Sequence, residues 1–186
     1  MKRSFDLLLA SMLILILFIP MLLVSIGIKF SSGGPILFVS DRVGQNNHLF
    51  KMLKFRTMKI GTPTVASHLL IDPQDAVTPL GRFLRESSMD ELPQIWNIIQ
   101  GHMSFVGPRP ALFNQTELIA LRTEKSIDSL LPGLTGWAQI NGRDELTIFD
   151  KVSFDHEYLL KQSFNFDLKV LWLTYLRVIG KDSISH

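Results

Sequence analysis

The 186-residue sequence contains no cysteine, which excludes a disulfide framework and any metal site built on thiolates. It also lacks a strong charge of either sign: 19 basic and 17 acidic residues leave a net charge of +2, too small to indicate nucleic-acid binding. The length suits one domain with a hydrophobic core and an appendage. Hydrophobic residues make up 46% of the chain, which is high for a soluble protein, and the excess lies in residues 5–30.

Residues 7–28 contain no charged side chain, and as a helix they are long enough to cross a bilayer core. A cleaved signal peptide is disfavoured because no small-residue cleavage site follows. A simple spanning helix is the plainer alternative, but Pro20 interrupts its hydrogen bonding. Basic residues flank both ends, so the positive-inside rule gives no orientation. We therefore favour a re-entrant helix that is broken at Pro20 and leaves by the face it entered.

The sequence as a whole predicts an α+β, mostly helical fold. A membrane-anchoring segment is expected in 1–30 and a compact cytoplasmic domain in 31–186. Residues 36–44 and 48–58 are short β-branched and aromatic runs on either side of a GQNN turn, which predicts a small β-hairpin. Residues 60–77 show no strong period, and we expect a loop with a short helix there.

Several helices are predicted after the hairpin. One begins at Pro79 with Thr78 as N-cap, and the next ends at Gly101. The stretch FVGPRP is expected to be extended, because each proline biases its predecessor away from helix. A Gly-rich loop with a short strand is expected over 131–143. The remaining helices are predicted over residues 111–123, 147–162 and 167–180.

The last of these helices has Asp167 as a plausible N-cap and a broad apolar face. Trp172 and Tyr175 on that face suit a membrane interface. Ordinary packing against the core explains the same face equally well, so both interpretations stay open.

The stretch SSMDELPQIWN, residues 87–97, places two acids just before a proline. Ser88 and Glu91 fit a capping box, but Pro93 would then fall inside the helix, where its ring clashes. If Asp90 is the N-cap instead, Pro93 moves to the first turn, and Asp90 lies at the positive end of the helix dipole. The local pattern alone favours capping over catalysis.

Nearby arginines change that balance. Arg82 and Arg85 precede the acidic pair, and Arg109 follows it between two prolines. Arginine's planar fork suits phosphate oxygens, and a carboxylate pair can hold a divalent metal. Carboxylates, arginines and a hard metal together indicate phosphoryl chemistry on a diphosphate.

The sequence resembles a known family, the small bacterial membrane-bound sugar transferases, which are polyprenyl-phosphate phosphoglycosyl transferases of glycan assembly. The resemblance runs over nearly the whole chain, and the block from Gly81 to Pro110 is highly specific. Besides the apolar segment with Pro20, it rests on the motifs GGPILFVSDRVG, KFRTM (54–58), LGRFLRESSMDELPQIWNII, MSFVGPRP and LPGLTGWAQINGR.

The resemblance implies a transferase with Asp90 and Glu91 as its catalytic pair. Asp90 is expected to attack the sugar-bearing phosphorus of a UDP-sugar and release UMP. Undecaprenyl phosphate, or another polyprenyl phosphate, then takes the phosphosugar from the aspartyl intermediate. Mg²⁺ is the expected cofactor, with both acids as its ligands. Whether Glu91 binds the metal, acts as a base or caps the helix stays open.

The family's phosphate- and substrate-binding residues fall on Lys54, Arg56, Arg85, Arg109 and Arg143. The resemblance further implies a re-entrant membrane helix, the bacterial inner membrane as location and an active site on the cytoplasmic face. The chain looks like the minimal catalytic form, and a homodimer is a further expectation. The loop GTPTVASHLL (61–70) resembles a variant associated with N-acetylated 6-deoxy amino sugars.

Two other functions stay open at this point. A membrane-attached scaffold or regulatory subunit would keep the fold without turnover. A metal-dependent phosphatase acting on lipid diphosphates would use the same anion site without a nucleotide sugar.

Overall fold

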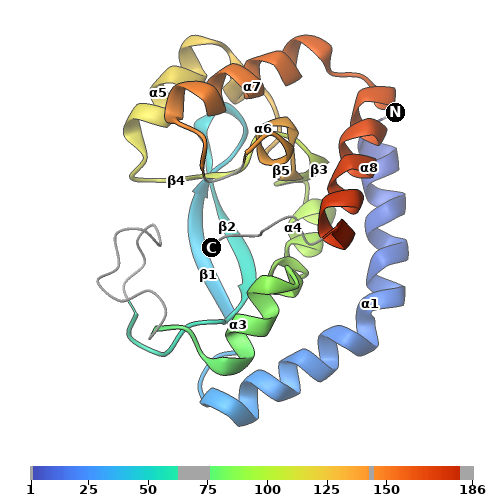
Figure 1. The fold of residues 1–186 in the computed structure, drawn as a ribbon, viewed down its shortest axis with the longest axis vertical. Coiled ribbons are helices and arrows are strands. Elements are labelled where there is room, and N and C mark those ends of the chain that lie inside the picture. The colour runs from blue at the N-terminus through green and yellow to red at the C-terminus, as the bar shows by residue number, and fades with distance from the viewer. Residues whose placement is uncertain (1, 63–75, 143–144, 181–186) are drawn as a thin grey trace.

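The computed structural model describes residues 2–62, 76–142 and 145–180 and is an α+β fold that is mostly helical (Figure 1). Its helices are α1 (Lys2–Ser32), α3 (Pro79–Glu86), α4 (Gln94–Gln100), α5 (Thr116–Glu124), α6 (Trp137–Ile140), α7 (Ile148–Lys161) and α8 (Phe164–Gly180). Its strands are β1 (Leu37–Val43), β2 (Leu49–Phe55), β3 (Ser104–Val106), β4 (Ala111–Leu112) and β5 (Gly133–Thr135). Short 3₁₀ turns are η1 (Gln45–Asn47), η3 (Met89–Glu91) and η4 (Ile127–Ser129).

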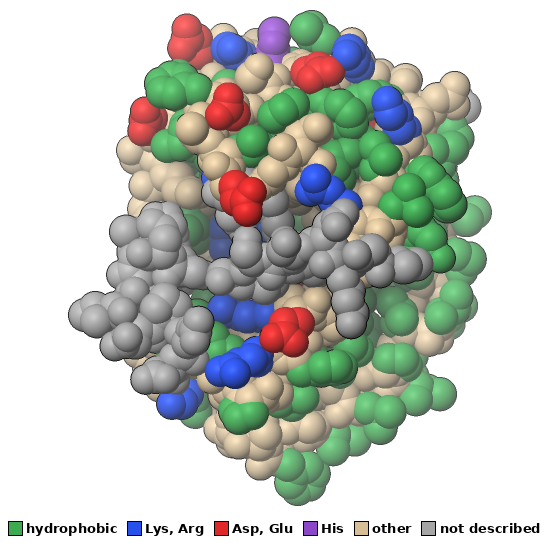
Figure 2. Space-filling view, viewed as in Figure 1, with side chains coloured by type: hydrophobic (Ala, Val, Ile, Leu, Met, Phe, Trp, Pro, Cys, Tyr) green, Lys and Arg blue, Asp and Glu red, His purple; other side chains and the backbone are tan. Residues whose placement is uncertain are grey.

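Helix α1 is long and apolar enough to cross a membrane. Only 6% of its most apolar 18-residue stretch is buried inside the protein. Leu15, Phe18 and Ile19 are each more than half exposed. Figure 1 shows α1 running along one side of the molecule and then turning beneath α3, and Pro20 lies within the helix. Figure 2 shows apolar side chains along this edge. Such an exposed apolar surface indicates membrane association.

The basic residues at the start of α1 contact the rest of the protein. Lys2 Nζ donates to Asp167 Oδ2 at 2.7 Å and to the Val106 carbonyl at 3.0 Å. Arg3 donates to the carbonyls of Ile98 and Ile99 at the end of α4. The carbonyls at the end of a helix carry partial negative charge, so a cation is favourable there. The N-terminal end of α1 is therefore attached to α4, β3 and α8.

Asp167 is not an N-cap, contrary to the sequence prediction. Helix α8 begins at Phe164, and Ser163 caps it, with its Oγ accepting from the Phe166 N–H at 3.2 Å. Asp167 is instead buried, and it accepts hydrogen bonds from Lys2 and from the Tyr158 hydroxyl at 2.6 Å. A partner at the other end of the chain thus fixes this side chain.

The predicted hairpin is confirmed. Strands β1 and β2 pair antiparallel from Leu37 opposite Phe55 to Val43 opposite Leu49. Strand β4 adds to the free edge of β1, with Arg42 opposite Leu112. This pairing is why the helix predicted over 111–123 begins only at Thr116. Contact with a distant strand overrides local propensity there.

Other predicted elements agree with the structure in part. Thr78 caps α3, with its Oγ1 accepting from the Gly81 N–H at 2.9 Å, and α4 ends at Gly101 as expected. Thr147 caps α7, and β5 is the short strand of the Gly-rich loop, paired in parallel with β3. The sequence did not predict α6. Most of the loop expected over 60–77 lies outside the described residues.

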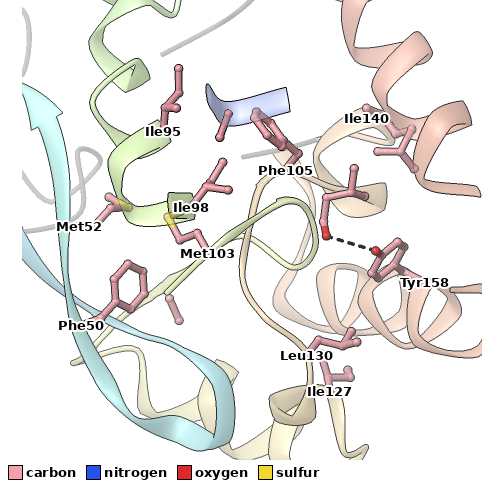
Figure 3. Close-up of a cluster of buried hydrophobic side chains, with 14 of the residues drawn as sticks. Phe50, Met52, Ile95, Ile98, Met103, Phe105, Ile127, Leu130, Ile140 and Tyr158 are labelled. Carbon is pink, nitrogen blue, oxygen red and sulfur yellow. Dashed lines mark hydrogen bonds between the residues drawn. The ribbon is translucent and has the colours of Figure 1, made fainter. Parts of the chain in front are cut away.

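The hydrophobic core joins the hairpin to the helices (Figure 3). Phe50 and Met52 of β2 contribute side chains on one side, and α4 contributes Ile95 and Ile98. The Tyr158 hydroxyl oxygen, deep in this core, also lies 3.2 Å from the Val106 carbonyl oxygen. The core therefore fixes α4, and with it the turn that precedes α4, against β2.

Gly81 allows α3 to lie against the end of the hairpin. A Cβ at this position would lie 2.0 Å from the Thr57 carbonyl oxygen, which is backbone and cannot move aside cheaply. That carbonyl also accepts a hydrogen bond from the Thr78 N–H at 2.9 Å. Close approach here places the start of α3 next to the residues that follow β2.

We predict that Gly81→Ala destabilises the protein by about 1–3 kcal/mol, the usual cost of overpacking a filled site. Thermal unfolding of the purified protein, followed by circular dichroism, measures the loss. Gly27→Ala is the matched control, because its Cβ would meet only the end of the Leu80 side chain, at 3.2 Å. Equal melting temperatures for the two variants would contradict this account.

Candidate active site

The acidic pair lies in the turn η3 between α3 and α4. Ser88 before it has a left-handed backbone (φ 55°) and makes no side-chain capping bond, so the capping-box interpretation is wrong. Helix α4 begins at Gln94 with Pro93 at the N-cap position, so Asp90 is not its N-cap either. Pro93 has no N–H to continue a helix from η3, which keeps the acids in a separate turn.

Lys54 at the end of β2 contacts both acids. Its Nζ lies 2.7 Å from Glu91 Oε1 and 3.6 Å from Asp90 Oδ2. The side chains are 18% exposed for Lys54, 11% for Asp90 and 13% for Glu91. Water screens charges weakly at such burial, so these ion pairs are stronger than typical surface pairs.

Asn97 of α4 holds β2 in place beside this turn. Its side chain is buried, accepts from the Leu53 N–H at 3.0 Å and donates to the Lys51 carbonyl at 2.8 Å. The amide thus takes the place of a neighbouring strand. Because Leu53 directly precedes Lys54, this contact fixes the position of Lys54 along β2 relative to the two acids.

Arg109, in the segment between β3 and β4, also contacts Glu91. Its Nη2 lies 3.3 Å from Glu91 Oε1. The Arg109 carbonyl accepts a hydrogen bond from Arg122 Nη1 at 2.9 Å, and Arg122 is paired with buried Asp155 at 2.6 Å. Burial raises the pKa of the Asp155 carboxyl, and the Arg122 charge opposes that shift. A buried ion pair therefore fixes the backbone between the two prolines.

Arg85 lies on the Asp90 side of the site. Its Nε donates to Thr57 Oγ1 at 2.9 Å, which orients the guanidinium. Burial lowers the pKa of Arg85, and the negative charge of Asp90 opposes that shift. The two side chains are thus close enough for their charges to interact.

Two other residues predicted to bind phosphate, Arg56 and Arg143, have no described contact with the acidic pair. Arg56 is buried and donates to Ser32 Oγ at 2.7 Å and to the Gly33 carbonyl, so it joins the C-terminal end of α1 to β2. No described contact brings it to the acids, and its role as a phosphate ligand stays a prediction. Arg143 lies outside the described residues.

The structure adds Arg42 of β1, which sequence analysis did not select for the site. Its Nη1 donates to the Pro110 carbonyl at 3.4 Å. Burial and the charge of Arg109 lower the pKa of Arg42 to about 10, and Glu91 opposes the shift. The signal was weak, because only the unpredicted pairing of β1 with β4 brings Arg42 beside Arg109.

The site therefore gathers four basic side chains around two carboxylates. An excess of positive charge in a partly buried site suits a diphosphate. Among the described residues, no group of three His, Cys, Asp or Glu side chains is placed to hold a metal ion. Mg²⁺ nevertheless needs only one or two carboxylates when phosphate oxygens complete its shell. The acidic pair fits such a metal–diphosphate complex.

Comparison with known proteins agrees with this chemistry. The chain is 38% identical over 186 residues to the UDP-glucose:undecaprenyl-phosphate glucose-1-phosphate transferase of Escherichia coli K12, covering 95% of this chain but 40% of that protein. It is 40% identical over 189 residues to the exopolysaccharide production protein ExoY of Rhizobium meliloti, covering 93% of this chain and 83% of ExoY. It is 36% identical to the uncharacterized sugar transferase EpsL of Bacillus subtilis, covering 100% of this chain and 91% of EpsL.

The chain thus spans about two fifths of the length of the E. coli enzyme and most of the length of the two shorter relatives. Residues 1–181 match the family described as Bacterial sugar transferase. This match covers α1, the hairpin and the acidic turn with its surrounding basic residues. The chain belongs to the bacterial sugar transferase family.

Proposed function

We propose that this protein transfers a sugar-1-phosphate from a UDP-sugar to undecaprenyl phosphate, releasing UMP and forming an undecaprenyl-diphosphate sugar. The observation that carries the proposal is the acidic pair in contact with Lys54 and Arg109, with the charges of Arg85 and Arg42 acting on it, in a member of this family. The name of the E. coli relative supports the substrates, since it includes UDP-glucose and undecaprenyl phosphate. The name of ExoY supports a place in exopolysaccharide synthesis.

Asp90 is the proposed nucleophile. Its carboxylate oxygen attacks the phosphorus that carries the sugar, and the bond from that phosphorus to the bridging oxygen breaks. UMP leaves with the bridging oxygen and the bond's electron pair. A phosphate oxygen of the lipid then attacks the same phosphorus and displaces the Asp90 carboxylate. Two successive displacements at the same phosphorus, through the Asp90 carboxylate, replace one direct displacement between two bulky anions.

The basic residues are proposed to bind and orient the diphosphate. Arg122 fixes the backbone of Arg109, which carries a planar guanidinium group, and Thr57 orients Arg85. Positive groups held in place before the reaction stabilise charge that develops on the transferring phosphoryl group. Mg²⁺, with Asp90 and Glu91 as ligands, would neutralise further phosphate charge when bound.

The re-entrant path of α1, with both ends cytoplasmic, belongs to the same proposal. Lys2 attaches one end of α1 to Asp167, and Arg56 attaches the other end to β2. A straight spanning helix would separate its ends by the thickness of the bilayer, about 30 Å, and only one end could then meet the domain. The proposed boundary near residue 30 falls two residues before α1 ends at Ser32.

The direct test is UMP release from a panel of UDP-sugars by purified protein with undecaprenyl phosphate and Mg²⁺. The panel includes UDP-glucose and an N-acetylated 6-deoxy amino sugar nucleotide. At least one sugar should give UMP and lipid-linked product in equal amounts, and Asp90→Asn should abolish both while keeping the melting temperature. A protein that releases no UMP from any member would be a scaffold, and phosphate release from a lipid diphosphate would identify a phosphatase.

Arg42 should contribute to nucleotide binding. We expect Arg42→Gln to weaken UDP binding about 10–100-fold, the usual range for a lost charge-assisted hydrogen bond. Arg82→Gln, at an exposed position of α3, is the control and should bind UDP like wild type. Calorimetric titration with UDP measures both variants. If the two bind UDP equally well, Arg42 is not part of the site.

The path of α1 can be tested in a chain that has no natural cysteine. Ser4→Cys and Ser31→Cys place one thiol at an exposed position near each end of α1. In intact bacteria, both thiols should resist a membrane-impermeant maleimide, and both should react once the cells are permeabilised. Labelling of only one position from outside would establish a spanning helix.

A further inference from the structure

Lys54 lies where a metal ion would be needed. Its ammonium group contacts Glu91 at 2.7 Å and Asp90 at 3.6 Å, the same carboxylates that are proposed to hold Mg²⁺. The three side chains are largely buried, so the lysine neutralises much of the negative charge that would attract a cation. An ammonium ion and a divalent cation cannot share these oxygens without strong repulsion.

Protein ligands for a metal are also few. Within the described ranges, no third acid or histidine stands close enough to complete a metal cluster with Asp90 and Glu91. Mg²⁺ prefers six oxygens in near-octahedral geometry and often takes several of them from substrate phosphates. Without a nucleotide, the pair offers the metal too few oxygens, and a competing cation occupies those.

Lys54 is also the basic residue best able to move away. Its backbone is fixed in β2, opposite Phe38, but its charge sits on a flexible four-carbon chain. Arg42 and Arg85 are held by hydrogen bonds to Pro110 and Thr57. A diphosphate oxygen arriving at the site would offer the ammonium group a new partner, at no cost in backbone movement.

We propose that Lys54 is an internal counter-ion that blocks the acidic pair from metal until a nucleotide diphosphate binds, so that Mg²⁺ enters with the substrate and not before it. The proposal rests on the proposed function, because it needs a nucleotide diphosphate as ligand. Lys54 moves from Glu91 to a phosphate oxygen, while Arg109 stays beside Glu91. The carboxylate oxygens that Lys54 leaves would then be available, with phosphate oxygens, to hold the metal. Metal and nucleotide binding are thereby coupled through one side chain.

This order has a consequence for the resting protein. Asp90 stays paired with cations when no substrate is present, so no metal is stored in the site. A metal–nucleotide complex then brings both the metal and the phosphates that displace Lys54. Coupling of this kind is reciprocal, so metal should strengthen nucleotide binding by the same factor that nucleotide strengthens metal binding.

The test measures metal binding directly, with Mn²⁺ as a probe that prefers the same oxygen ligands. Free Mn²⁺ is counted by electron paramagnetic resonance during titration of the purified full chain, with and without UDP, after correction for Mn²⁺–UDP in solution. Wild type should bind Mn²⁺ weakly alone and about tenfold or more tightly with UDP, within the usual range of coupling between sites.

Lys54→Met removes the charge and keeps most of the length of the side chain. It should bind Mn²⁺ alone about tenfold more tightly than wild type and gain less from UDP, because the block is gone. Lys51→Met is the matched control, since Lys51 lies on the same strand, is 68% exposed and pairs with Asp41 instead. It should behave like wild type in both titrations.

A second variant guards against loss of fold. Lys54→Gln keeps a hydrogen-bond donor for Glu91 without the charge, and it should also tighten Mn²⁺ binding in the absence of UDP. If both neutral variants bind Mn²⁺ no more tightly than wild type, or wild type binds it equally well with and without UDP, the proposal is wrong. Wild type that releases no UMP from any UDP-sugar would instead overturn the proposed function, whatever the metal titrations show.

Discussion

The site depends on the buried side chain of Asn97, which links α4 to β2. It bonds to backbone groups on either side of Met52 in β2, and it lies on the helix that follows the acidic turn. Without it, two partly buried backbone groups would lose their partner, at a cost of up to about 1–3 kcal/mol each. These two hydrogen bonds align Lys54 with Asp90 and Glu91. The core around Ile95 and Ile98 holds α4 in place.

A second set of contacts places this site relative to a membrane. Both ends of α1 contact the domain, through Lys2 at Asp167 and through Ser32 at Arg56, and the exposed apolar face lies between them. A domain held at both ends of its anchor stays close to the lipid surface. There a soluble nucleotide sugar and a lipid phosphate can reach the same carboxylate, as the proposed reaction requires.

Local signals in the sequence predicted the elements that local chemistry determines. Thr78 with Pro79 and Gly101 mark helix ends correctly, because each acts on backbone within a few residues. The predictions that failed concern side chains with distant partners. The local pattern around Asp90 favoured a helix cap, but Asp90 pairs with Lys54. Asp167 was also expected to cap a helix, but it pairs with Lys2, 165 residues away. Arg42 was missed because the pairing of β1 with β4 has no local pattern. The prediction that the acidic pair is catalytic came from the resemblance to a family, and not from periodicity.

The central claim is that Asp90 carries the phosphosugar between the two substrates. Mass spectrometry of the protein after incubation with its UDP-sugar and Mg²⁺, without lipid acceptor, tests this directly. The account predicts about one equivalent of UMP per protein and the added mass of a phosphosugar on the peptide that contains Asp90. UMP release that strictly requires the lipid acceptor, with no modified peptide, would contradict it.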